Sequence, residues 1–166
     1  MKRLTSLIAF LVAITYGYSE YSEIIDYTKS YKAQVIAVSD GDTITVRTQN
    51  SKQKIRLFGV DCPEKLQPYG RAATLLTQKL AYRKLVKITP LQTDRYGRTV
   101  AYVALPDGSK LNYELVSSGL AWWSKQYAPE EMQIATREIQ ARLKGIGLWQ
   151  DISPIPPWDF RKGVRH

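Results

Sequence analysis

Three short runs of strand-like sequence follow one another after residue 30. They are Ala33 to Ser39, Thr43 to Thr48 and Lys54 to Val60, and they are rich in Val and Ile or alternate between apolar and polar residues. Such alternation is typical of β-strands with one buried face. The turn-forming segment Asp40-Gly41-Asp42 and residues 49–52 separate the runs, so we predict an antiparallel meander of three strands.

The spacing of apolar residues changes from strand-like to helical after Pro63. Between Gly70 and Lys84 the apolar residues predict one amphipathic helix. They are Ala72, Leu75, Leu76 and Leu80. Two further strands are predicted at Lys84 to Pro90 and Thr99 to Leu105, joined through residues 93–98.

Two more helices are predicted beyond the fifth strand. Asn112 to Ser118 can cap and form a short helix that ends at Gly119. A longer helix is predicted after Pro129, with apolar residues at Met132, Ala135, Ile139 and Leu143. The order βββ-α-ββ-α-α predicts a mainly β, α+β fold, namely a five-stranded OB-fold Greek-key barrel with three helices. This architecture is a recurrent binder of nucleic acid strands.

The predicted domain spans residues 31–151 and is followed by a proline-rich tail at 152–166. Pro154, Pro156 and Pro157 lie in this tail. Because proline interrupts helices and central strands, we expect the tail to be neither helical nor part of the sheet. We expect it to pack back on the domain, with Trp158 anchored in an apolar groove.

The N-terminus has the pattern of a cleaved secretion signal at residues 1–19. Lys2 and Arg3 precede an apolar run from Leu7 to Ile14, and the small residues Gly17 and Ser19 follow, where we expect cleavage. The alternative, an uncleaved membrane anchor, is disfavoured because a spanning helix needs about 20 apolar residues. We therefore expect a linker at 20–30, no stable membrane span, and a secreted or periplasmic protein.

The net charge and the rare residue types narrow the chemistry. The 166 residues fit one domain and carry a formal net charge of +9, which favours polyanions such as nucleic acid, anionic membrane or cell-wall polymer. His166 is the only histidine, which disfavours a Ser-His-Asp triad or a histidine-ligated zinc. Cys62 is the only cysteine, so no intrachain disulfide can form. Acid and base chemistry must come from carboxylates, tyrosine or lysine.

Three segments concentrate charged residues at predicted strand ends. They read SDGDT at 39–43, RLFGVDCPE at 56–64 and DRYGR at 94–98. Carboxylates without histidine or thiolate ligands favour a hard cation such as Ca²⁺ or Mg²⁺. Arginine matches two oxygens of a phosphate, and a further carboxylate can position or deprotonate water. Together these groups suffice for phosphodiester hydrolysis.

The order of these three motifs, followed by Gly119-Leu120-Ala121, resembles the staphylococcal nuclease (thermonuclease) family from about Tyr31 to Trp149. The resemblance implies a calcium-dependent nuclease that acts on DNA or RNA and leaves 3′-phosphate ends. We expect a monomer with no obligate protein partner.

The resemblance also assigns a metal site. It implies that Asp42 and Asp61 bind one Ca²⁺, with another divalent ion as the alternative. The residue after the second aspartate is usually threonine in the family and contributes its backbone carbonyl to the metal. This sequence has Cys62 at that position. A carbonyl ligand does not depend on the side chain, although a hydrogen bond of the threonine hydroxyl would be lost.

Catalytic and substrate-binding roles follow from the same resemblance. Arg56 should bridge the scissile phosphate, and Glu64 should align or deprotonate the attacking water. Arg98 should offset the charge that develops on the phosphorane and the leaving oxygen. A further set is expected to face the substrate: Arg95, Tyr96, Trp123 and Tyr127.

Two other functions fit parts of the pattern. One is a non-catalytic OB-fold module that binds single-stranded nucleic acid, and the other is a surface protein that uses its charge on an anionic polymer. Degenerate copies of the domain usually lose the metal aspartates or the two arginines, which this chain retains. The sequence leaves open the choice of DNA or RNA and of endo- or exonucleolytic action.

Overall fold

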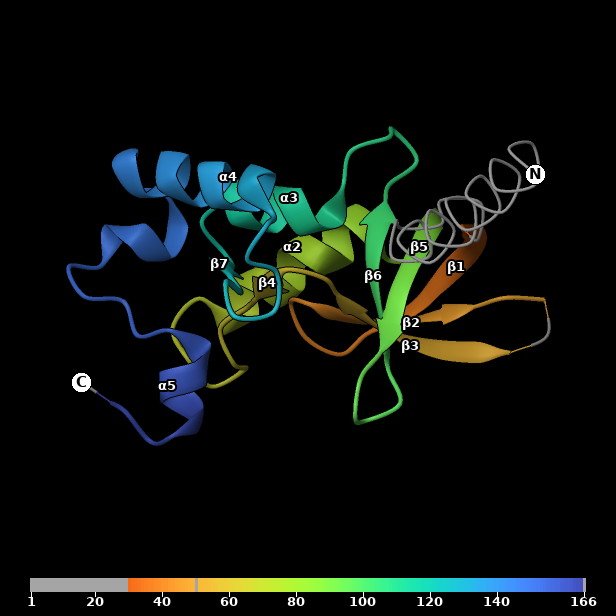
Figure 1. Cartoon of the computed structure of the whole chain (residues 1–166), viewed down its shortest axis with the longest axis horizontal. Coiled ribbons are helices and arrows are strands. Elements are labelled where there is room, and N and C mark those ends of the chain that lie inside the picture. Colours follow the sequence, from red (N-terminus) through yellow and green to blue (C-terminus); the bar gives the residue numbers. More distant parts are fainter. Residues whose placement is uncertain (1–29, 50, 166) are drawn as a thin grey trace, which may run out of the picture. The chain divides into compact units, whose positions relative to one another are not determined.

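Five strands close into a barrel in the order β1-β2-β3-β6-β5 (Figure 1). They are β1 (Tyr31–Val38), β2 (Thr43–Arg47), β3 (Lys52–Leu57), β5 (Leu85–Thr93) and β6 (Thr99–Ala104). The predicted α+β fold with a five-stranded barrel is confirmed. The strand boundaries differ from the predicted ones by a few residues.

This computed structural model describes residues 30–49 and 51–165. The predicted secretion signal at 1–19 and residues 20–29 of the predicted linker lie outside the described residues. The barrel and everything that follows it belong to one compact unit that starts at Tyr31. Within the described part of the chain, no helix is long and apolar enough to cross a membrane.

The barrel core is built from the inward-facing residues of the alternating strands. β1 pairs antiparallel with β2, and β2 pairs antiparallel with β3, so Val35 lies opposite Val46 and Ile44 opposite Ile55. All four side chains are fully buried. Burying an aliphatic side chain of this size stabilises a fold by about 1.5–3 kcal/mol, so the alternation drives closure of the barrel.

One strand pair in the barrel is parallel. β3 runs alongside β6 with Arg56 opposite Val100. The antiparallel pair of β5 and β6 precedes this contact, with Thr93 opposite Thr99. The loop between β5 and β6, which carries the DRYGR motif, therefore ends at Thr99 opposite Ile55, the residue next to Arg56.

The three main helices lie near their predicted positions. They are α2 (Gly70–Ala81), α3 (Leu111–Ser117) and α4 (Met132–Leu143). α2 ends before the predicted Lys84 because the C-cap residue Tyr82 is extended, with ψ of 133°, and Arg83 after it is left-handed, with φ of 62°. α3 packs against both α2 and α4. Asn112 does not cap α3, because the N-cap position is Lys110 and no side chain caps the helix.

The third strand ends at Leu57 and not at Val60. Gly59 turns the chain there with φ of 75°, a conformation that glycine adopts without strain. The chain then forms a separate two-residue strand, β4 (Val60–Asp61), which pairs antiparallel with β7 (Trp122–Trp123). This small sheet was not predicted, and it holds Asp61 against the segment after α3.

The prediction of a tail without helix is wrong. After the short 3-10 helix η2 (Gly147–Gln150), residues Pro157–Arg161 form the helix α5. Pro156 is the extended N-cap residue, and Pro157 is the first helical residue. A proline is tolerated at this position because the first N–H groups of a helix have no partner within the helix and the ring presets φ.

Candidate active site

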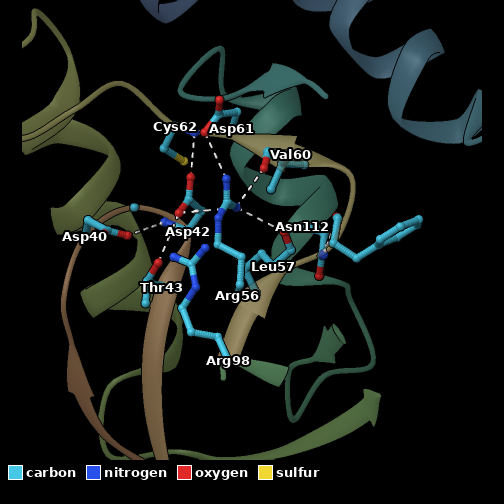
Figure 2. A network of polar contacts seen from close by, with 12 residues as sticks. Asp40, Asp42, Thr43, Arg56, Leu57, Val60, Asp61, Cys62, Arg98 and Asn112 are labelled. Atoms are coloured by element: carbon cyan, nitrogen blue, oxygen red, sulfur yellow. Dashed lines mark hydrogen bonds and ion pairs between the residues drawn. The ribbon is translucent and has the colours of Figure 1, made fainter. Parts of the chain in front are cut away.

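The Arg56 guanidinium joins the two aspartates that the sequence assigns to a metal. Its Nη1 lies 3.2 Å from Asp42 Oδ1, and its Nη2 lies 2.9 Å from Asp61 Oδ1 (Figure 2). Nη1 also donates to the carbonyl of Val60 at 2.7 Å and to that of Leu57 at 3.1 Å. These backbone contacts hold the plane of the guanidinium between the two carboxylates.

The two aspartates are almost completely buried. Asp42 is 7% exposed and Asp61 is 5% exposed. Desolvation by burial raises the pKa of Asp42 and that of Asp61, and the nearby arginines do not fully offset this effect. Because the arginines do not fully compensate the burial of the two carboxylates, a bound cation would stabilise their ionised forms.

The donor atoms suit a hard divalent ion. Among residues 30–49 and 51–165, no group of three or more His, Cys, Asp and Glu side chains is arranged to hold a metal. The carboxylates of Asp42 and Asp61 and the neighbouring backbone carbonyls are the oxygen atoms that would hold a divalent ion here. Oxygen ligands of this kind fit Ca²⁺ or Mg²⁺ and do not fit a structural zinc.

The Asp-Gly-Asp turn packs closely against Cys62. The N–H of Cys62 donates to Asp42 Oδ2 at 2.7 Å. A Cβ atom at Gly41 would lie 2.7 Å from both the Cys62 sulfur and the Ala73 Cβ, so a larger residue does not fit there. Desolvation and the nearby Asp42 raise the pKa of the Cys62 thiol well above its usual value, which leaves it protonated and unreactive. Metal ligation by its carbonyl stays a prediction.

Glu64 lies in a short loop that leads into α2. Its N–H donates to Gln67 Oε1 at 3.0 Å, and its carbonyl accepts from the N–H of Gln67 at 2.8 Å. The side chain of Glu64 is 41% exposed, so its carboxylate remains accessible to water.

A tail arginine that the sequence did not assign to the site contacts two of its carboxylates. Arg161 of α5 places Nη1 2.6 Å from Glu64 Oε1 and Nη2 2.6 Å from Asp61 Oδ2. Nothing in the sequence pattern distinguishes this arginine from the other cations of the tail. Only the folded chain brings it to residues about a hundred positions earlier.

Arg98 is held by Asp94 at the other side of the site. Its Nε lies 2.6 Å from Asp94 Oδ2, and its N–H donates to Asp94 Oδ1 at 3.0 Å. Although desolvation alone would raise it, the pKa of Asp94 is lowered by hydrogen bonds from Arg98 and from the N–H of Tyr96. In Figure 2 the Arg98 guanidinium points toward Asp42 and Arg56. The structure thus brings the predicted catalytic and metal residues to one end of the barrel.

Comparison with known proteins shows which family the chain resembles. Residues 54–151 match the family described as staphylococcal nuclease homologue. The chain is 41% identical over 128 residues to an uncharacterized endonuclease of Escherichia coli, across 77% of this chain and 83% of the relative. It is 33% identical over 145 residues to a micrococcal nuclease of Shigella flexneri, across 82% of this chain and 83% of the relative. The chain belongs to the staphylococcal nuclease family.

The predicted family is therefore confirmed, and the chain is a nuclease of that family. A third relative, an uncharacterized endonuclease of Haemophilus influenzae, is 39% identical over 130 residues, across 78% of this chain and 72% of the relative.

Of the four predicted substrate-facing residues of this nuclease, Tyr96 contacts the site, because the Arg98 guanidinium carbon lies 5.3 Å from the centre of its ring. Arg95 Nη2 donates to the hydroxyl of Tyr96 at 2.7 Å, and Tyr96 and Tyr127 are 67% and 70% exposed. Trp123 is half-buried, and its indole N–H donates to Ala128 O at 2.9 Å. None of the contacts found in the described part of the chain joins these four side chains to Arg56. Their role in substrate binding stays a prediction.

A buried asparagine, Asn112, supports the backbone next to the nuclease site, and the sequence pattern did not predict this role. Asn112 is fully buried, and its Nδ2 donates to the carbonyl of Phe58 at 2.8 Å. Its Oδ1 accepts from the N–H of Val103 at 3.1 Å. Asn112 thus fixes the turn at Phe58 and Gly59, through which the chain passes from Arg56 to Asp61. An asparagine near a predicted helix start is typical of a cap, so the pattern gave no sign of this contact.

Proposed function

We propose that this nuclease is a calcium-dependent endonuclease that hydrolyses phosphodiester bonds of DNA or RNA by in-line attack of water. The proposal includes products with 3′-phosphate ends, as the family resemblance implies. The observation that carries it is the position of the Arg56 guanidinium, which lies between the carboxylates of Asp42 and Asp61 at 3.2 and 2.9 Å. Two relatives of the chain are an endonuclease and a micrococcal nuclease, which supports the proposal further.

In this proposal Asp42, Asp61 and the carbonyl of Cys62 hold the cation. When bound, a divalent cation supplies positive charge that polarises a phosphoryl oxygen. The burial of both aspartates supports this role because buried carboxylates require compensation by a cation.

The two arginines bind the phosphate and stabilise the charge that develops on it. Arg56 offers a rigid fork of donors whose plane is fixed by the carbonyls of Leu57 and Val60. Arg98 lies in the loop between β5 and β6, where Asp94 holds its guanidinium. Donors that are already in position contribute most to the rate because they need no reorganisation during the reaction.

Glu64 handles the attacking water. Its half-exposed carboxylate can accept a hydrogen bond from water and either orient it or take its proton. The high net positive charge supports attraction of a polyanionic substrate. The pattern of residues 1–19 supports action outside the cytoplasm, as a secreted or periplasmic enzyme.

Cleavage assays test the proposal. Labelled single- and double-stranded DNA and RNA are incubated with the purified protein in Ca²⁺, in Mg²⁺ or with EDTA, and the product ends are identified by their response to a 3′-phosphatase. We expect cleavage in Ca²⁺ and none with EDTA. Cleavage that persists with EDTA would contradict the metal dependence.

A Glu64→Gln variant separates catalysis from binding. It should retain nucleic acid binding while kcat falls by orders of magnitude, because an amide cannot take a proton from water. Glu130→Gln, which changes an exposed residue outside the site, is the matched control. Unaltered turnover of Glu64→Gln would show that the role of this residue is wrong. Binding without any cleavage by the unmodified protein would favour the non-catalytic module.

A further inference from the structure

The tail helix α5 is docked beside the Glu64 loop by contacts that involve no charged group. Pro157 is buried, and the rings of Trp158 and Trp122 meet edge to face with centroids 5.6 Å apart. Trp122 belongs to β7 and lies opposite Asp61 in the small sheet. The tail therefore packs against the element that carries a predicted metal ligand.

A single buried amide joins the tail to the Glu64 loop. Gln67 is 7% exposed, and its Oε1 accepts from the N–H of Glu64 at 3.0 Å. Its Nε2 donates to the carbonyl of Ile155 at 2.5 Å. The backbone of Glu64 and the backbone just before α5 are thus held by the same side chain, which places α5 against the site without any help from Arg161.

Arg161 extends from this docked helix to two carboxylates. It bridges Glu64 Oε1 and Asp61 Oδ2 at 2.6 Å each, and its Nη1 also lies 3.4 Å from Asp61 Oδ1. Among the contacts found for residues 30–49 and 51–165, Arg161 is the only side-chain partner of the Glu64 carboxylate. Two like-charged carboxylates repel each other at short range. A guanidinium between them offsets this repulsion and fixes the distance between them through its directed hydrogen bonds.

We propose that Arg161 is a positioning residue of this nuclease, which holds the Glu64 carboxylate at a set position relative to Asp61. The inference rests on the proposed function of Glu64. A half-exposed glutamate without a partner samples several rotamers, and only some of them can direct a water toward a phosphate held by the metal site. Arg161 restricts this sampling from a helix that is itself fixed.

The main alternative is that Arg161 competes with the cation for Asp61. Its anchoring argues against this, because Gln67, Pro157 and the Trp158–Trp122 contact keep α5 in place whatever occupies the carboxylates. An arginine that only competed with the cation for Asp61 would not have to contact Glu64, yet one of the two shortest contacts of Arg161 is with Glu64. The two roles predict opposite effects when the arginine is removed.

A double-mutant cycle tests the proposal. Arg161→Gln should lower kcat by about 10- to 100-fold, the usual effect of losing a group that orients a functional side chain, with KM within about twofold. Arg161→Lys should recover part of the loss because an ammonium can pair with one carboxylate. In a Glu64→Gln background, Arg161→Gln should cause no further loss of kcat. Lys162→Gln removes the neighbouring, exposed tail cation and should leave kcat unchanged.

Two measurements without turnover complete the test. Ca²⁺ affinity of Arg161→Gln, measured by titration calorimetry, should stay within about threefold of the unmodified protein, well below a tenfold change. The thermal midpoint in EDTA should fall by no more than a few degrees, as expected for a partly exposed ion pair.

Three outcomes would overturn the positioning role. An equal loss of kcat in the Glu64→Gln background would mean that Arg161 acts independently of Glu64. Tighter Ca²⁺ binding with higher activity at limiting Ca²⁺ would establish competition with the cation, and unchanged kcat would remove any role in turnover. Full activity of Glu64→Gln alone would instead refute the proposed function of Glu64, so the two failures are distinguishable.

Discussion

Gly70 begins α2 directly against the main chain of Glu64. A Cβ atom at position 70 would lie 1.8 Å from the carbonyl oxygen of Glu64, far inside any allowed contact. The N–H of Gly70 also donates to the carbonyl of Gln67 at 3.0 Å, which closes the loop tightly. The position of the proposed water-binding carboxylate therefore depends on the absence of a side chain at residue 70.

Replacing Gly70 by alanine should displace the Glu64 loop. We expect Gly70→Ala to lower the free energy of unfolding by about 1–3 kcal/mol or more, the usual cost of overpacking, and to lower kcat. Urea denaturation and cleavage assays measure both. Gly108→Ala is the control, because a Cβ at Gly108 meets nothing within 4 Å and only backbone strain remains. Equal stability of Gly70→Ala and the unmodified protein would contradict the close approach.

The fork of Arg56 should not be replaceable by another cation. Lysine presents a single charged nitrogen and cannot contact Asp42, Asp61 and two backbone carbonyls together. We expect Arg56→Lys to lower kcat/KM by about 10²- to 10³-fold, as for loss of one preorganised donor to a transition state. Arg47→Lys, on the exposed end of β2, should have kcat/KM near the unmodified value. Wild-type kcat/KM in Arg56→Lys would exclude bidentate binding by this residue.

Asp94 should matter to catalysis through Arg98. Asp94→Asn removes the charge that holds the Arg98 Nε at 2.6 Å. We expect kcat to fall by about 10- to 100-fold because the guanidinium is no longer oriented. Asp107→Asn is a matched control, since Asp107 also closes a turn by accepting from the N–H of a following residue, Ser109. A similar loss in both variants would indicate a general effect of turn geometry.

The same carboxylate makes a defined contribution to pH dependence. The pKa of Asp94 lies below its ordinary value of 3.8, so its ionised form stabilises the folded state above that pH. The contribution is lost as pH falls through the lowered pKa. The difference in thermal midpoint between the unmodified protein and Asp94→Asn should therefore be present at about pH 6 and shrink progressively as the pH falls below 3.8. A difference that grows on acidification would have the wrong sign.

Asn112 should be important for stability despite its distance from the proposed reaction. Asn112→Ala leaves the carbonyl of Phe58 and the N–H of Val103 without their buried partner. At about 1–3 kcal/mol for each of these two unsatisfied groups, we expect a loss of about 2–6 kcal/mol in unfolding free energy, measured with urea. Gln126→Ala, at an exposed position, should change stability little.

The local pattern of the sequence predicted most of the barrel. Residues such as Ile44 and Ile55 alternate with polar neighbours, and this alternation directly reflects one buried face. α4 (Met132–Leu143) lies where a helix was predicted after Pro129. The extents of these elements were therefore found, within the usual uncertainty at element ends. The buried face of α4 was not, because the apolar residues that marked this helix, Met132, Ile139 and Leu143, are exposed. Its buried face is formed by Ile134, Ala135, Glu138 and Ala141.

Contacts between segments that are distant in the sequence could not be predicted from local pattern. Asn112 and Arg161 act through partners 54 and 97 residues away, and neither has a local signature of that role. α5 was missed because a run of prolines disfavours a helix, whereas one proline at the first position is compatible with it. Arg56 and Asp61 were found only because motifs in a fixed order resemble a known family, since each alone fits an ordinary strand or turn.

The parallel pairing of β3 and β6 determines when the site can form during folding. Arg56 lies opposite Val100 although the whole of α2 and β5 separates them in the sequence. Contacts of this kind form slowly because closing a long intervening segment costs chain entropy. The meander of β1, β2 and β3 involves only near neighbours and should assemble earlier. An open barrel leaves Arg56 and Arg98, the two arginines proposed to bind phosphate, apart. Nuclease activity during refolding should therefore return with barrel closure and lag behind the first strand signal.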